Sequence, residues 1–197
     1  MPAAVTELVA PALLVAMPQV QDASFHKSVV LLVHHDEEGS LGFVLNRVSP
    51  VKIAEIFEGL TLSWWGDRDA LADLGGPVQP QLGTVLFAAG GSTPEVALSA
   101  ASELTAGLSL TQHVGDLARL AEQPPRRFRL LLGYAGWGEG QLVDEILRND
   151  WLVVPISAEL VFDDHKDELW ERSLRSVGVD PGILPSWTSA NHEDHAN

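Results

Sequence analysis

The sequence predicts an α+β protein that folds as a single compact domain around a mixed β-sheet. Its 197 residues suit one domain with a sizeable core. Short β-branched and apolar runs, bounded by glycine and proline, dominate the first half of the chain. Because both strand–strand and strand–helix–strand successions occur, the pattern favours a mixed sheet over a purely parallel, doubly wound one.

The first half begins with a buried strand over Leu13–Met17, which ends at Pro18. A β-hairpin over 28–46 follows, because two strand-like runs flank DEEGS, where Gly39 can supply the positive φ of a tight loop. The run SVVLLV is apolar on both faces, so we expect its strand to lie inside the sheet rather than at an edge.

Apolar periodicity and turn residues predict the remaining elements. In chain order they are a helix over 51–59, a loop over 60–75, a sharp turn at 75–77, a strand over 83–89, a helix over 111–122, a strand over 127–133, a glycine-rich loop over 133–140, a helix over 141–148, a strand over 151–156 and a helix over 167–177. We expect residues 1–186 to form the domain and the polar tail 187–197 to be disordered.

Composition excludes several classes of protein. Twelve Lys and Arg oppose 27 Asp and Glu, so the formal net charge of −15 argues against direct binding of nucleic acid. The absence of Cys excludes disulfides, thiolate metal sites and Cys nucleophiles. The apolar run 8–17 is too short to cross a bilayer and lacks a preceding basic region, so we expect a cytoplasmic protein with no membrane partner.

The segment Gly133–Gly140 (GYAGWGEG) lies between a predicted strand and a predicted helix, the context of a phosphate-binding loop. However, Glu139 stands where such a loop needs Lys, and a carboxylate at a helix start repels a second anion. The favoured interpretation is a tight connection in which Tyr134 and Trp137 pack over the sheet. Nucleotide binding is the alternative.

No metal site, cofactor or catalytic residue is predicted. The clusters His34-His35-Asp36 and Asp163-Asp164-His165 have too few ligands at suitable spacing, and His192 and His195 lie in the polar tail. No GxSxG motif is present. We interpret the basic run Arg126-Arg127-Phe128-Arg129 as the solvated start of a strand.

Polar residues at the ends of elements are the remaining candidates. Asn46 and Arg47 end a strand, a turn follows at 75–78, and Gln141 and Glu145 lie one helical turn apart. If the strand ends converge, these groups line one groove. An alternative of equal weight is that these side chains only form hydrogen bonds with nearby backbone groups at the ends of the elements.

At these positions the chain resembles the AlgH/YqgE family of bacterial proteins, over about 13–184. The motifs that carry the resemblance are LLVAMP (13–18), FHKSVVLLVHHDEEGSLGFVLNR (25–47), GGPV (75–78), LLLGYAGWGEGQLVDEI (130–146), NDWLVVP (149–155) and LVFDD (160–164). The resemblance implies a single α+β domain but no assigned activity; the family is named for a proposed role in regulating alginate synthesis. It also implies a shared candidate binding surface made of Asn46, Arg47, Gly76, Pro77, Gly133, Tyr134, Trp137, Gln141 and Glu145.

Three functional hypotheses follow. The first is a non-enzymatic protein that binds another protein or a small ligand through the groove, with any role in regulation indirect. The second is a binder of nucleotides or phosphometabolites, or an enzyme, that uses the Gly133–Gly140 loop with Arg47 supplying positive charge. The third is an assembly role in which Trp64 and Trp65 form an interface patch. The sequence does not indicate an oligomeric state.

Overall fold

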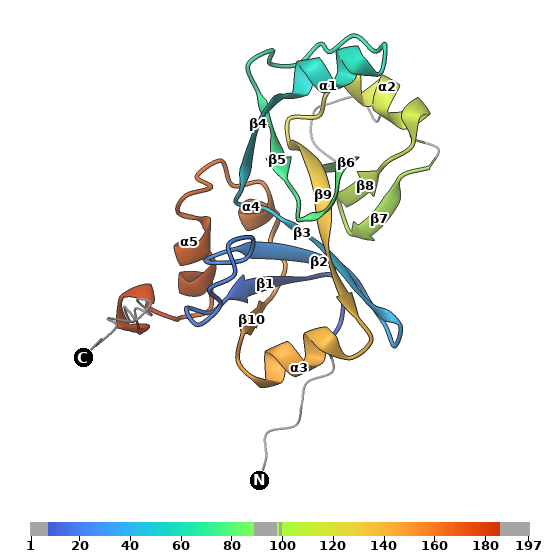
Figure 1. Ribbon diagram of the computed structural model, residues 1–197. Coiled ribbons are helices and arrows are strands. Elements are labelled where there is room, and N and C mark those ends of the chain that lie inside the picture. The colour runs from blue at the N-terminus through green and yellow to red at the C-terminus, as the bar shows by residue number, and fades with distance from the viewer. Residues whose placement is uncertain (1–7, 89–97, 99, 186–197) are drawn as a thin grey trace, which may run out of the picture.

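The computed structural model describes residues 8–88, 98 and 100–185 (Figure 1). Its strands are β1 (Ala12–Ala16), β2 (Val29–His35), β3 (Gly39–Val44), β4 (Val48–Lys52), β5 (Leu71–Leu74), β6 (Val78–Ala88), β7 (Ser102–Thr105), β8 (Leu108–Thr111), β9 (Phe128–Gly138) and β10 (Trp151–Val154). Its helices are α1 (Ile53–Gly59), α2 (Val114–Glu122), α3 (Gln141–Leu147), α4 (Ala158–Val161), α5 (Leu169–Ser176) and a 3₁₀ turn over Pro181–Ile183.

All the described strands belong to one curled sheet, whose main path runs β10-β1-β2-β3-β9-β6-β8-β7. β4 pairs with β5 beside this path. Neighbouring strands are antiparallel except β5 and β9, which run parallel. The mixed sheet and the single α+β domain predicted from the sequence are therefore confirmed.

β9 is the strand on which both parts of the sheet depend. Its first half pairs with β6 from Phe128 to Leu132, and its second half pairs with β3 from Ala135 to Gly138. Between the halves, Gly133 has a φ of +71°. Figure 1 shows the result: β9 extends from the upper part, with α1, α2 and β4–β8, into the lower part with β1–β3 and β10.

The apolar core follows from the β-branched runs of β1 and β2. All five residues of β1 are buried, and so are the first four of β2. Side chains on one face pack with Leu169, Trp170 and Leu174 of α5, and those on the other face pack with Leu142 of α3. A further cluster lies beneath α1 and α2. β2 lies between β1 and β3, so the expected interior position of SVVLLV is confirmed.

The predicted hairpin over 28–46 is confirmed as β2 and β3, with a bulge between Leu32 and His34. The predicted loop over 60–75 is wrong at its end, where Leu71–Leu74 forms β5. Four residues give little periodicity of their own. Pairing with β9 and β4 supplies the hydrogen bonds that make the segment a strand.

The predicted glycine-rich loop over 133–140 is also wrong, because β9 continues to Gly138 and only Glu139 and Gly140 turn into α3. Glycine weakens an isolated strand, yet here β3 pairs with Gly136 and Gly138. β6 begins at Val78 rather than at residue 83, and β4, β7 and β8 were not predicted. The tail 187–197 lies outside the described residues.

Two glycines permit the close contact between β9 and the turn before β6. A Cβ on Gly76, whose φ is +154°, would lie 2.2 Å from the carbonyl carbon of Tyr134. A Cβ on Gly133 would lie 2.5 Å from the carbonyl oxygen of Gly76. Because the opposing atoms belong to the backbone, no rotamer change relieves either clash.

We therefore predict that Gly76→Ala lowers the free energy of unfolding by about 2–4 kcal/mol. Gly59→Ala is the matched control, because its added Cβ meets nothing within 4 Å at the end of α1. Urea denaturation followed by tryptophan fluorescence measures both. Equal stability of the two variants would show that the contact is not tight.

Candidate functional site

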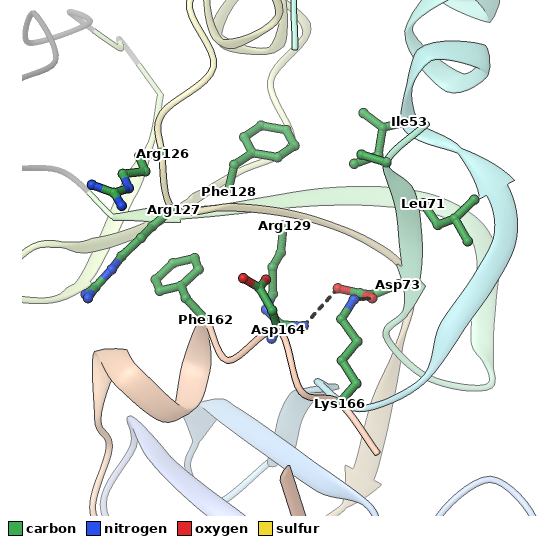
Figure 2. Close-up of a pocket in the computed structure, with 11 residues that line it drawn as sticks. Ile53, Leu71, Asp73, Arg126, Arg127, Phe128, Arg129, Phe162, Asp164 and Lys166 are labelled. Carbon is green, nitrogen blue, oxygen red and sulfur yellow. Dashed lines mark hydrogen bonds and ion pairs between the residues drawn. The ribbon is translucent and has the colours of Figure 1, made fainter. Parts of the chain in front are cut away.

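A polar cleft of about 540 Å³ lies between the upper and lower parts of the molecule (Figure 2). We call it the basic cleft. It is formed by the start of β9, by β5 and the start of α1, and by the connection between α4 and α5. Its lining residues are Ile53, Ala70, Leu71, Asp73, Arg126, Arg127, Phe128, Arg129, Phe162, Asp164 and Lys166.

A buried ion pair forms the inner wall of the basic cleft. Arg129 of β9 is 5% exposed and Asp73 of β5 is 2% exposed. The Nη1 of Arg129 donates to Oδ2 of Asp73 at 3.0 Å and to the carbonyl oxygen of Leu45 at 2.8 Å. Its Nη2 donates to the carbonyl oxygen of Asp163 at 2.6 Å. One guanidinium thus joins β9 to β5, to the end of β3 and to the connection after α4.

The α4–α5 connection is held against this wall by two further ion pairs. Lys166 donates to Oδ1 of Asp73, on the other side of the carboxylate from Arg129. Arg172 of α5 lies 3.0 Å from Oδ2 of Asp163, which is itself buried. Buried charges keep their partners close because an unpaired one costs several kcal/mol. The wall is therefore rigidly arranged before any ligand arrives.

Arg126 and Arg127 differ from Arg129, because both are exposed and neither side chain has a hydrogen-bond or ion-pair partner within the described part of the chain. In Figure 2 they extend from the segment that enters β9, on the left of the basic cleft. Two guanidinium groups are thus available to a ligand, each with donors arranged for a carboxylate or a phosphate.

The local charge of the basic cleft is opposite to that of the whole protein. It holds four of the chain's twelve basic residues but two acidic ones, in a protein with a formal net charge of −15. Walls of low dielectric strengthen the field of such a cluster inside a cleft. The cleft can therefore attract a small anion although the protein as a whole repels one.

Sequence reasoning missed this site. It took Arg126–Arg129 as a solvated strand start, which is wrong for Arg129, a buried residue. The sequence does hold a clue to it, because each of two apolar segments contains one charged residue. These are Arg129, which precedes LLL, and Asp73, which follows Ala72. A buried charge needs a partner of opposite sign, so the two positions could have been paired.

Seven of the nine residues of the predicted binding surface fall into two groups. Arg47, Gly76 and Pro77 line a small hollow of about 200 Å³ with Leu74 and Val44. Asn46 lies beside it and bonds to the backbone of β2 and of the segment before it: its Oδ1 accepts from Val29 N–H at 2.9 Å, and its Nδ2 donates to Lys27.

Arg47 also forms hydrogen bonds with the backbone. Its guanidinium donates to the carbonyl oxygens of Asn46 and His26, and burial lowers its pKa below the ordinary value of an arginine. An arginine pKa is high enough that the group stays charged at pH 7. Arg47 therefore holds the β1–β2 connection against β3.

The second group surrounds Glu145 of α3. Its Oε2 accepts from Nε1 of Trp137 at 2.9 Å and from Nε1 of Trp151 at 2.8 Å, and its Oε1 accepts from Gln141 at 2.9 Å. The Oε1 of Gln141 accepts from Gly138 N–H at 3.1 Å. This network ties α3 to β9 and β10, so it gives these side chains partners within the fold.

The remaining two residues, Gly133 and Tyr134, provide the close backbone contact with Gly76 described above. Phe25, in the connection between β1 and β2, packs against the second group, since its ring lies 6.3 Å from that of Trp137 and 5.8 Å from that of Trp151. Of the nine residues, Asn46 and Arg47 donate to the connection between β1 and β2, at the carbonyl oxygens of Lys27 and His26. These contacts favour the local, structural alternative, while ligand binding at this surface stays a prediction.

Other sequence candidates have separate places. His34 pairs with Asp36 at 2.7 Å, and His165 pairs with Asp163. Over the described ranges, no three His, Asp or Glu side chains gather as a metal site would require. Trp64 stacks on Phe57 with centroids 5.0 Å apart, whereas Trp65 is 74% exposed. An interface patch at this position would therefore present one indole ring, not two.

Arg129→Met should destabilise the protein by about 3 kcal/mol or more, because it leaves the carboxylate of Asp73 buried with Lys166 as its remaining ion-pair partner. Arg68→Met is the control, since its pair with Glu58 is exposed and worth less than about 1 kcal/mol. Chemical denaturation of both variants tests this difference, and equal losses would contradict the structural role of Arg129.

Glu145→Ala should cost about 2–4 kcal/mol, because two indole N–H groups lose their acceptor in a largely buried site. Asp144→Ala on the exposed face of the same helix should cost less than about 1 kcal/mol. Thermal unfolding and tryptophan emission report both effects. A Glu145→Ala protein as stable as Asp144→Ala would show that the network contributes nothing.

Comparison with known proteins supports the resemblance noted in the sequence. A family described as AlgH-like matches residues 13–182. A protein of Myxococcus xanthus (strain DK1622), named UPF0301 protein, is 40% identical over 176 residues, which cover 89% of this chain and 94% of the relative. These names state no activity.

Two solved structures share the fold. The solution structure of the AlgH protein from Pseudomonas aeruginosa has a TM-score of 0.73 at 30% identity, covering 95% of this chain and 98% of that one. A crystal structure of a protein from Corynebacterium diphtheriae has a TM-score of 0.72 at 24% identity, covering 86% and 87%. The length of these matches and their continuity across the sheet and the helices show that the chain belongs to the AlgH-like family.

Proposed function

We propose that this protein binds a small organic anion in the basic cleft and acts without catalysing a reaction. The observation that carries the proposal is the pair Arg126 and Arg127, which have no partner in the described part of the chain, beside a wall whose charges are already paired. A carboxylate or phosphate group accepts hydrogen bonds from guanidinium donors of this kind. The negative charge of the ligand would pair with these two guanidinium groups.

The size of the cleft supports a small molecule. A volume of about 540 Å³ lies within the range of ordinary ligand pockets, about 300–1,000 Å³. The apolar side chains of Ile53, Phe128 and Phe162 supply hydrophobic lining next to the charges. Because the Arg129–Asp73 wall is ordered beforehand, binding need order only the exposed side chains of Arg126 and Arg127.

A small ligand is favoured over a nucleic acid. A duplex contacts an extended basic surface, whereas this acidic protein gathers four of its twelve basic residues in one small cleft. A role in regulation would therefore be indirect, through the bound ligand or another protein. Among the helices that the structure describes, none has both the length and the hydropathy to cross a bilayer. A cytoplasmic location remains part of the proposal.

The fold argues against the alternative in which residues 133–140 bind a nucleotide. The amide groups of a phosphate-binding loop must be free to face the ligand. Here Gly136 and Gly138 pair with β3, and the N–H of Gly138 donates to Gln141. The charge that a phosphate needs lies instead at the other end of β9.

We predict that citrate and inorganic phosphate bind the wild-type protein with an affinity that falls at least tenfold in the double variant Arg126→Ala/Arg127→Ala. Isothermal titration calorimetry at low and physiological salt measures the change, and added salt should weaken binding because the attraction is electrostatic. The matched control is Arg68→Ala/Arg175→Ala, which removes two exposed arginines from surface ion pairs elsewhere.

Two results would contradict the proposal. One is a wild-type protein to which neither anion binds. The other is an equal loss of affinity in the control, because the effect would then reflect net charge and not the basic cleft.

A further inference from the structure

Asp164 is a carboxylate that the basic cleft leaves without a partner. Its side chain is exposed and makes no hydrogen bond or ion pair to any described residue. It lines the cleft from the α4–α5 connection, and Figure 2 shows its carboxylate near the middle of the view, on the Phe162 side of Arg129.

The two nearby cations are committed to other acceptors. Arg129 donates to Asp73 and to two backbone carbonyl groups, and Lys166 donates to Asp73. Arg172, beyond the cleft, is paired with Asp163. The carboxylate of Asp164 therefore adds an uncompensated negative charge to a cleft otherwise suited to anions.

The free charges of opposite sign come from different segments. Arg126 and Arg127 belong to the chain entering β9, whereas Asp164 belongs to the connection between α4 and α5. Figure 2 shows the arginines on the left and Asp164 toward the centre. The arginines would attract a purely anionic ligand, and Asp164 would repel it. A cleft that carries charges of both signs therefore discriminates between anions and ligands that also carry a positive group.

From this separation of charge we infer that the ligand of the basic cleft is a small zwitterion. Its carboxylate or phosphate binds Arg126 and Arg127, and its ammonium group donates to the carboxylate of Asp164. The inference rests on the proposed function and narrows its ligand class. Asp164 acts as the specificity residue, because it favours an amine and disfavours anions that lack one.

The test compares aminoethyl phosphate with ethyl phosphate, which carry the same phosphate and differ by the ammonium group. Calorimetry should show that the wild-type protein binds aminoethyl phosphate at least tenfold more tightly. Asp164→Asn should weaken aminoethyl phosphate about tenfold and strengthen ethyl phosphate about threefold, because the amide removes both the attraction and the repulsion. Opposite changes for the two ligands distinguish this role from a general loss of structure.

Asp144→Asn is the control, since it makes the same charge change on the exposed face of α3, far from the basic cleft (Figure 1). It should leave the ratio of the two affinities unchanged. Equal wild-type affinities for the two phosphates, or parallel changes in Asp164→Asn, would overturn the inference while leaving anion binding in place. If neither phosphate binds the wild-type protein, the inference and the proposed function both fail.

Discussion

The buried guanidinium of Arg129 is the interaction on which the organisation of this molecule depends. It donates to the end of β3, to β5 and to the connection after α4, three segments far apart in sequence. A buried charge cannot be left unpaired without a large penalty, so the segments must meet at this point. The same contact forms the inner wall of the basic cleft. The stability of the junction and the shape of the candidate site therefore have one physical origin.

A second constraint is the change of partner along β9. Pairing with β6 ends at Tyr134 and pairing with β3 begins at Ala135, and the turn at Gly76 approaches the backbone of β9 more closely than any side chain permits. This bend places the charged start of β9 beside the α4–α5 connection. The glycines that resemble a phosphate-binding loop in the sequence thus serve the packing of two parts of a sheet.

The nine residues singled out by motif show how structural and functional signals can be confused. Glu145 accepts from two indole groups, and Arg47 and Asn46 hold backbone groups next to β2. Such polar networks restrict which residue type can stand at each position, because every donor and acceptor in the network needs its partner. Their specificity does not require a ligand. The arginines of the basic cleft, in contrast, carry no motif beyond a short basic run.

The sequence alone establishes the α+β class, the hairpin of β2 and β3, the buried first strand and the family, since these depend on local periodicity and on contiguous motifs. It did not reveal β5, the length of β9 or the pairing of Arg129 with Asp73. Those features exist because distant segments satisfy one another's hydrogen bonds and charges. Only the tertiary structure brought Arg126, Arg127 and Asp164 around one cleft, because local sequence carries no record of which strand edges and connections will meet.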